Sequence, residues 1–143
     1  MNKYIIIISF VVLSTNKTPA SIILNFLSQS KIVQIEIWKN NKKCKYPEIT
    51  MTFCQLNKTI KINKMGQFEL THDLVQYGDI IFHIDKVDLK FSNINFDMNG
   101  VGTKWIIKLE NLDKLTYNYS FIPGNGAIIT ATKIGKPPKL KCK

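Results

Sequence analysis

The chain contains no arginine, and all 20 of its basic residues are lysines. Specific reading of nucleic-acid bases and bidentate clamping of phosphates depend on the planar guanidinium fork of arginine. Lysine still neutralises phosphates, but without sequence preference. The absence of arginine therefore argues against a nucleic-acid partner.

Apolar runs long enough to cross a bilayer are also missing. A transmembrane helix needs about 20 consecutive apolar residues, and the apolar run at 4–13 is too short for that. It follows Lys3 and precedes a short polar stretch ending in Ala20, an arrangement typical of a secretory signal peptide. We expect cleavage after Ala20, with Ser14 as the alternative, so that residues 21–143 are secreted without a membrane span. A buried N-terminal strand is the other interpretation of this run.

The chain has three cysteines, Cys44, Cys54 and Cys142. In an oxidising compartment this odd number predicts one disulfide and one remaining thiol. A Cys44–Cys54 bond would close a short loop, whereas Cys142 could tie the lysine-rich C-terminal tail back to the body of the domain. The spacing leaves all three pairings open.

Residues that carry catalysis or bind metals are scarce. The sequence has no G-x-S-x-G elbow, no Walker loop and no G-x-G-x-x-G motif. The two histidines, His72 and His83, each lie near an aspartate, but no nucleophile has a suitable spacing from either. The cysteines and histidines also lack the ligand spacing of a zinc site. We therefore expect a protein that is not an enzyme and that holds no cofactor or metal.

Most of residues 31–133 alternate between apolar and polar side chains, the pattern of half-buried strands. The expected strands cover 31–38, 49–56, 59–64, 67–74, 80–98, 103–110, 115–121 and 127–133. The phase of the long segment changes near Ser92-Asn93, which predicts a bulge or bend there. Turns are expected at Asn99-Gly100 and at 123–126, and a helix is plausible only at 21–30.

Eight or nine strands at this spacing predict an all-β fold. The expected architecture is a single-domain antiparallel β-sandwich, Ig-like or β-cup, over residues 21–143. Its C-terminal tail is rich in lysine.

The formal net charge is +10, and it falls to about +8 when Lys3 and Lys17 leave with the signal peptide. Lysines cluster at 39–45, 58–64 and 133–143. They form either a solubilising surface or a contact for an acidic protein, an anionic glycan or lipid headgroups. Sequons at Asn57 and Asn118 are candidate glycosylation sites.

Residues 44–74 contain Leu56-Asn57-Lys58-Thr59, then Gly66-Gln67-Phe68-Glu69-Leu70 and Asp73-Leu74. This segment resembles the front half of insect secreted proteins related to the ML lipid-recognition and ganglioside-activator families. The resemblance implies a β-sandwich or β-cup that holds an apolar ligand between its sheets without catalysis. The later paired cysteines of those families are missing here.

Large apolar side chains are numerous for a domain of two sheets. If the sheets splay apart, these side chains would line a cavity for a lipid-like ligand; if they meet tightly, they fill the core. Our first hypothesis is the ligand-binding sandwich, with lining residues Phe82, Phe91, Phe96, Trp105, Tyr117 and Tyr119. The alternative is a secreted interaction or effector module that binds a protein or glycan through its basic surface.

Overall fold

The structure, a computed structural model, describes residues 30–74, 77–95 and 101–143. The predicted signal peptide, the predicted helix up to residue 29, the Asn99-Gly100 turn and Phe96 lie outside these ranges. The chain divides into two units, Met1–Ser30 and Lys31–Lys143. The description below concerns the second unit.

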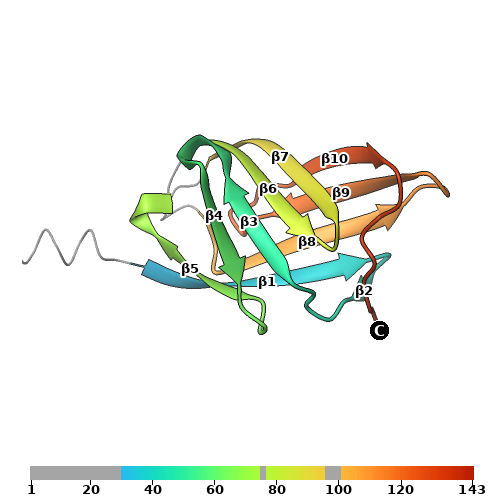
Figure 1. The fold of residues 1–143 in the computed structure, drawn as a ribbon, viewed down its shortest axis with the longest axis horizontal. Coiled ribbons are helices and arrows are strands. Elements are labelled where there is room, and N and C mark those ends of the chain that lie inside the picture. Colours follow the sequence, from blue (N-terminus) through green and yellow to red (C-terminus); the bar gives the residue numbers. More distant parts are fainter. Residues whose placement is uncertain (1–29, 75–76, 96–100) are drawn as a thin grey trace, which may run out of the picture. The chain divides into compact units, whose positions relative to one another are not determined.

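Ten strands in two sheets make up this unit, and the sheets lie one over the other (Figure 1). The first sheet has the order β10-β9-β8-β1-β2, with β5 also paired to β1, and the second has the order β4-β3-β6-β7. The first contains β1 (Ser30–Lys39), β2 (Lys42–Lys43), β5 (Gln67–Thr71), β8 (Lys104–Asn111), β9 (Thr116–Ile122) and β10 (Ile129–Ile134). The second contains β3 (Ile49–Phe53), β4 (Lys58–Ile62), β6 (Tyr77–Ile84) and β7 (Val87–Asn95). The predicted all-β sandwich is confirmed.

The apolar and polar residues that alternate in the sequence correspond to buried and more exposed side chains along the strands. On β3, Ile49, Met51 and Phe53 are buried and the threonines between them are half-exposed. A strand presents successive side chains to opposite faces, so each such strand turns its apolar set toward the other sheet. Two predicted strands end early, because short 3-10 helices occupy Cys54–Leu56 and His72–Leu74.

The pairing of β1 with β8 departs from the expected antiparallel arrangement, since these strands run parallel from Gln34↔Lys104 to Lys39↔Leu109. A parallel pair needs a long crossover between its strands. Here the whole second sheet lies between β1 and β8 in the chain. Periodicity reports the faces of a strand but not its neighbours, so this pairing could not be predicted from the alternation of residues.

The long segment predicted at 80–98 is a hairpin. Its strands β6 and β7 are joined by a tight turn at Asp85-Lys86, where Asp85 has a φ of 50°. The prediction missed this turn. The phase change near Ser92-Asn93 is a register shift, since Gly78 faces Ile94 while Ile80 faces Phe91.

A disulfide joins Cys44 to Cys142, and Cys54 is a half-buried free thiol. The two bonded cysteines also face each other in an antiparallel bridge. The C-terminal segment therefore lies alongside the residues that follow β2 (Figure 1). Of the three pairings left open by the sequence, the structure has the one that ties the tail to the body.

Aromatic rings fill the space between the sheets. The ring of Phe121 on β9 lies 5.3 Å from Phe82, 5.3 Å from Phe91 and 5.2 Å from Trp105, measured between centroids. Two of these partners belong to the second sheet and one to the first, so Phe121 contacts rings of both sheets. Its side chain is fully buried.

Replacing Phe121 by alanine is expected to lower the free energy of unfolding by about 3–5 kcal/mol, because a cavity would open among three rings. Urea denaturation measures the change. Ile122→Ala is the matched control, since Ile122 is the next residue on β9 and turns to the other face of the sheet. Equal losses in the two variants would contradict the central position of Phe121.

Candidate functional site

The residues predicted to line a ligand cavity lie in this core. Phe82, Phe91, Trp105, Tyr117 and Tyr119 are each at most 7% exposed. The centroids of Phe91 and Tyr119 are 5.2 Å apart, and those of Phe82 and Phe91 are 6.0 Å apart. Three hollows on the described residues lie elsewhere, and none is lined by these side chains. The rings therefore contact one another, and their role as ligand contacts stays a prediction.

Two tyrosines in this group differ in the partner of their hydroxyl. The Tyr119 hydroxyl donates to the carbonyl of Lys90 on the opposite sheet at 3.0 Å. The buried Tyr117 hydroxyl has no hydrogen-bond partner among the described residues. Burial raises the pKa of both phenols.

The variant Tyr117→Phe is expected to keep or raise the free energy of unfolding, by up to about 3 kcal/mol, because it removes an unpaired buried hydroxyl. Tyr119→Phe is the matched control and should lose about 0.5–1.5 kcal/mol with its hydrogen bond. Thermal or urea unfolding of both variants gives the comparison. A large loss in Tyr117→Phe would instead show that its hydroxyl has a partner, such as a bound ligand.

One histidine belongs to a chain of polar contacts on the second sheet. His83 Nδ1 lies 2.7 Å from Asp88 Oδ1, and His83 Nε2 lies 2.8 Å from the Thr52 hydroxyl. Asp85 is the aspartate nearest to His83 in the sequence, but the hairpin register places Asp88 opposite His83. Strand β3, which carries Thr52, is paired on both sides. Its amides are committed to the ladder, so they offer no oxyanion donors to this hydroxyl.

Over residues 30–74, 77–95 and 101–143, no group of three or more metal-binding side chains is close enough to hold an ion. Within the same ranges, no helix has the length and apolar character needed to cross a bilayer.

A basic surface forms where the disulfide joins the two lysine-rich stretches. We call it the basic seam and define it as residues 43–45 and 139–143. Lys45 N donates to the Lys141 carbonyl at 2.8 Å, and Lys143 N donates to the Lys43 carbonyl at 3.1 Å. These bonds flank the Cys44↔Cys142 bridge. The bridge thus makes neighbours of two lysine clusters whose bonded cysteines are 98 positions apart in the sequence.

The seam places like charges opposite each other. The bridge sets Lys43 against Lys143 and Lys45 against Lys141, and like charges in directly opposed strand positions are destabilising. Lys43 is neutralised by Glu36 at 2.8 Å. Within the described residues, Lys45 and Lys141 have no ion-pair partner. A hollow of about 210 Å³ lies between these two stretches, lined by Lys45, Tyr46, Pro47, Lys139, Leu140 and Lys141.

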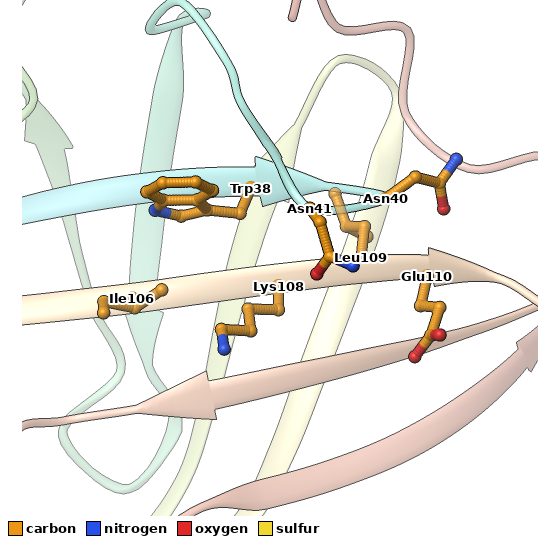
Figure 2. Close-up of a pocket in the computed structure, with 7 residues that line it drawn as sticks. All are labelled: Trp38, Asn40, Asn41, Ile106, Lys108, Leu109 and Glu110. Carbon is orange, nitrogen blue, oxygen red and sulfur yellow. The ribbon is translucent and has the colours of Figure 1, made fainter.

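A second hollow lies beside the seam, on the face of the first sheet that is turned away from the core. Its volume is about 290 Å³, and it is lined by Trp38, Asn40, Asn41, Ile106, Lys108, Leu109 and Glu110 (Figure 2). Asn40 and Asn41 form the turn between β1 and β2, with φ values of 48° and 62°. Paired positive φ values are typical of a tight hairpin turn, and asparagine adopts them readily.

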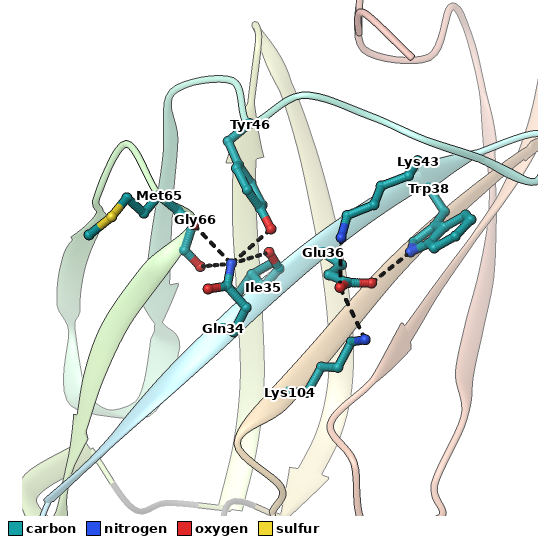
Figure 3. A network of polar contacts seen from close by, with 9 residues as sticks. All are labelled: Gln34, Ile35, Glu36, Trp38, Lys43, Tyr46, Met65, Gly66 and Lys104. Atoms are coloured by element: carbon teal, nitrogen blue, oxygen red, sulfur yellow. Dashed lines mark hydrogen bonds and ion pairs between the residues drawn. The ribbon is translucent and has the colours of Figure 1, made fainter. Parts of the chain in front are cut away.

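Glu36 connects this hollow to the seam. Its carboxylate accepts hydrogen bonds from the Trp38 indole at 3.1 Å and the Lys43 ammonium at 2.8 Å, and it forms an ion pair with Lys104 at 3.0 Å (Figure 3). The hydrogen bond from Lys43 is the main cause that lowers the Glu36 pKa from 4.5 to about 2, with Lys104 and Trp38 adding to it and burial opposing it. The residue is only 7% exposed although it lies on the outer face.

Beside Glu36, a second set of contacts holds the seam's neighbour Tyr46. Gln34 Nε2 donates to the Tyr46 hydroxyl at 2.8 Å and to the Met65 carbonyl at 2.9 Å (Figure 3). Gly66 has a φ of 77°, and a Cβ there would lie 2.3 Å from the Tyr46 ring. Glycine at this position therefore lets the Tyr46 ring pack closely, which fixes one wall of the hollow at the seam.

Replacing Glu36 by glutamine is expected to lower the stability of the protein at pH 7, by at most about 3 kcal/mol for a pKa displaced this far. Because the folded pKa is depressed, the advantage of the wild type is present above pH 4.5 and is lost as the pH falls toward 2. Urea denaturation across this range measures it. Glu48→Gln, which breaks an exposed pair with Lys61, is the control and should change stability less. If the stability difference between the wild type and Glu36→Gln did not change with pH, the depressed pKa of Glu36 would be contradicted.

Part of this site could be predicted from the sequence. The lysine clusters were identified, but their meeting depends on the disulfide. Trp38 was not selected, although it follows Gln34 and Glu36 on the polar face of its strand, and a large aromatic side chain in that register was an available signal.

The two predicted glycosylation sites differ in their surroundings. Asn57 is exposed in a left-handed turn, whereas Asn118 lies on β9 and accepts a hydrogen bond from Thr132 at 2.7 Å.

Comparison with protein-family models, with curated proteins and with solved structures found no match for this chain. The resemblance to the ML and ganglioside-activator families stays a prediction. A functional proposal for this domain therefore rests on its own residues.

Proposed function

We propose that this protein is a secreted, non-enzymatic binding module that engages an anionic partner through the basic seam. The observation that carries the proposal is the bridge between residues 43–45 and 139–143, which gathers two lysine-rich stretches on one surface. The bridge thus adds the charges of the C-terminal segment to those of the residues that follow β2.

The unfavourable charge arrangement supports a binding role over a purely solubilising one. A solubilising surface works best when charges of both signs are interspersed. At the seam, Lys45 and Lys141 oppose each other without an ion-pair partner among the described residues, whereas Lys58 and Lys90 on the second sheet are paired with aspartates. An anionic group placed between Lys45 and Lys141 would turn their repulsion into two attractions.

The seam also has the form of a contact surface. The hollow of about 210 Å³ is bounded by three lysines and by the apolar surfaces of Tyr46, Pro47 and Leu140. Two of its walls are fixed, one by the disulfide and the other by the Gln34–Tyr46 hydrogen bond. A site held in place before binding loses less conformational entropy when the partner arrives.

The lipid-carrier hypothesis receives less support from the geometry. It requires space between the sheets, and the described rings of Phe82, Phe91 and Phe121 lie in mutual contact there. Core packing explains the presence of these apolar residues. It does not explain the unpaired lysines of the seam.

Loss of two seam charges should weaken binding to a polyanion. We expect Lys45→Gln/Lys141→Gln to bind immobilised heparin roughly 5- to 30-fold more weakly than the wild type, the effect of losing two exposed charge contacts. Elution on a sodium chloride gradient and titration at fixed ionic strength measure this change.

The matched control is Lys58→Gln/Lys90→Gln, which removes the same charge from the second sheet. Both of its lysines lie outside the seam, on β4 and β7. The control should bind heparin nearly as tightly as the wild type. Equal weakening of the two double variants would show that only the net charge matters, and the seam would then be a solubilising surface.

A further inference from the structure

The hollow beside the seam carries a more specific inference, which rests on the proposed function. Its floor combines the indole of Trp38 with the side chain of Ile106, and polar groups stand around them (Figure 2). We propose that this hollow binds one ring of an acidic saccharide, with the sugar stacked on Trp38.

The indole is held as a fixed platform. Its N–H donates to Glu36, and Glu36 is in turn held by Lys43 and Lys104 (Figure 3). The indole therefore has its hydrogen-bonding atom satisfied from within the protein, and its flat surface is left for an apolar contact. The hydrogen-bearing face of a pyranose ring offers such a contact.

Three polar side chains around the platform remain uncommitted. The Asn41 amide, the Lys108 ammonium and the Glu110 carboxylate line the hollow, and none forms a hydrogen bond or ion pair with a described residue. Together they supply donors and an acceptor, the combination that sugar hydroxyls require. The fourth polar group, Asn40, is committed, because its Oδ1 accepts a hydrogen bond from Asn111 N at 2.9 Å.

The charge around the indole favours an acidic sugar over a neutral one. Trp38 on β1 faces Lys43 on β2 and Lys108 on β8 across the sheet. The Lys43 ammonium is already held by Glu36, so the Lys108 ammonium, which lines the hollow, is the cation suited to a carboxylate or sulfate substituent. The basic seam begins at Lys43, so a longer chain leaving the hollow would meet further lysines.

The size of the hollow is consistent with one ring. Its volume of about 290 Å³ is near the lower bound, about 300 Å³, of typical ligand pockets. A hollow with a carboxylate, an ammonium and an amide at its rim is also poorly suited to an acyl chain. These features separate the saccharide from a lipid tail as the occupant.

Fluorescence offers a direct test, because the chain has two tryptophans and Trp105 is fully buried. Titration with a heparin hexasaccharide is expected to change the emission of Trp38. Inorganic polyphosphate, a polyanion without a sugar ring, is expected to bind more weakly and to leave the emission nearly unchanged. In Trp38→Ala, hexasaccharide affinity should fall roughly five- to tenfold, as for the loss of one aromatic contact, while polyphosphate affinity stays the same.

Two further variants separate the contribution of the Trp38 platform from that of the lysines. Lys108→Gln keeps the platform and should lower hexasaccharide affinity while folding normally, whereas Lys45→Gln/Lys141→Gln should weaken both polyanions. If Trp38→Ala binds the hexasaccharide like the wild type, or if a single-stranded oligothymidylate binds more tightly than the hexasaccharide, the saccharide assignment is overturned. If the wild type binds no polyanion at all, the proposed function fails together with it.

Discussion

The feature on which the rest of the account depends is the bond between Cys44 and Cys142. It closes a loop that contains most of the domain, and disulfides across loops of this length are worth about 4–5 kcal/mol in the chain-entropy model. Part of that stabilisation is opposed by the two unpaired lysines that the bond brings opposite each other, Lys45 and Lys141. The disulfide thus sustains an arrangement that charge alone would push apart.

The core and the outer surface of the domain have different roles. The ring cluster around Phe121 joins the sheets and gives a rigid body. The polar face of the first sheet and the seam at its edge carry the groups left over from packing, namely an anchored indole, three uncommitted polar side chains and the unpaired lysines. Rigidity in the core matters to the surface, because Trp38 lies on the same strand as the buried Ile35 and Ile37.

Much of the fold could be predicted from the sequence, because alternation along a strand follows directly from which face is buried. The strands containing Ile49 and Tyr117 are examples, and so is the bulge near Ser92-Asn93. Pairing could not be predicted, since the parallel contact of β1 with β8 depends on how the whole chain closes. The site was predicted in pieces: its lysines were visible as clusters, but the choice of Cys142 over Cys54 as the partner of Cys44, which unites them, is a property of the folded chain.

The most direct measurement is the free energy of unfolding of the wild type and of Lys45→Gln/Lys141→Gln at low ionic strength, first without and then with saturating heparin. If repulsion across the bridge is maintained for binding, the variant is more stable than the wild type in the free state. Heparin then reverses the order, because it stabilises the wild type more. A wild type that is already the more stable protein without heparin, or an order that heparin does not change, would contradict the account.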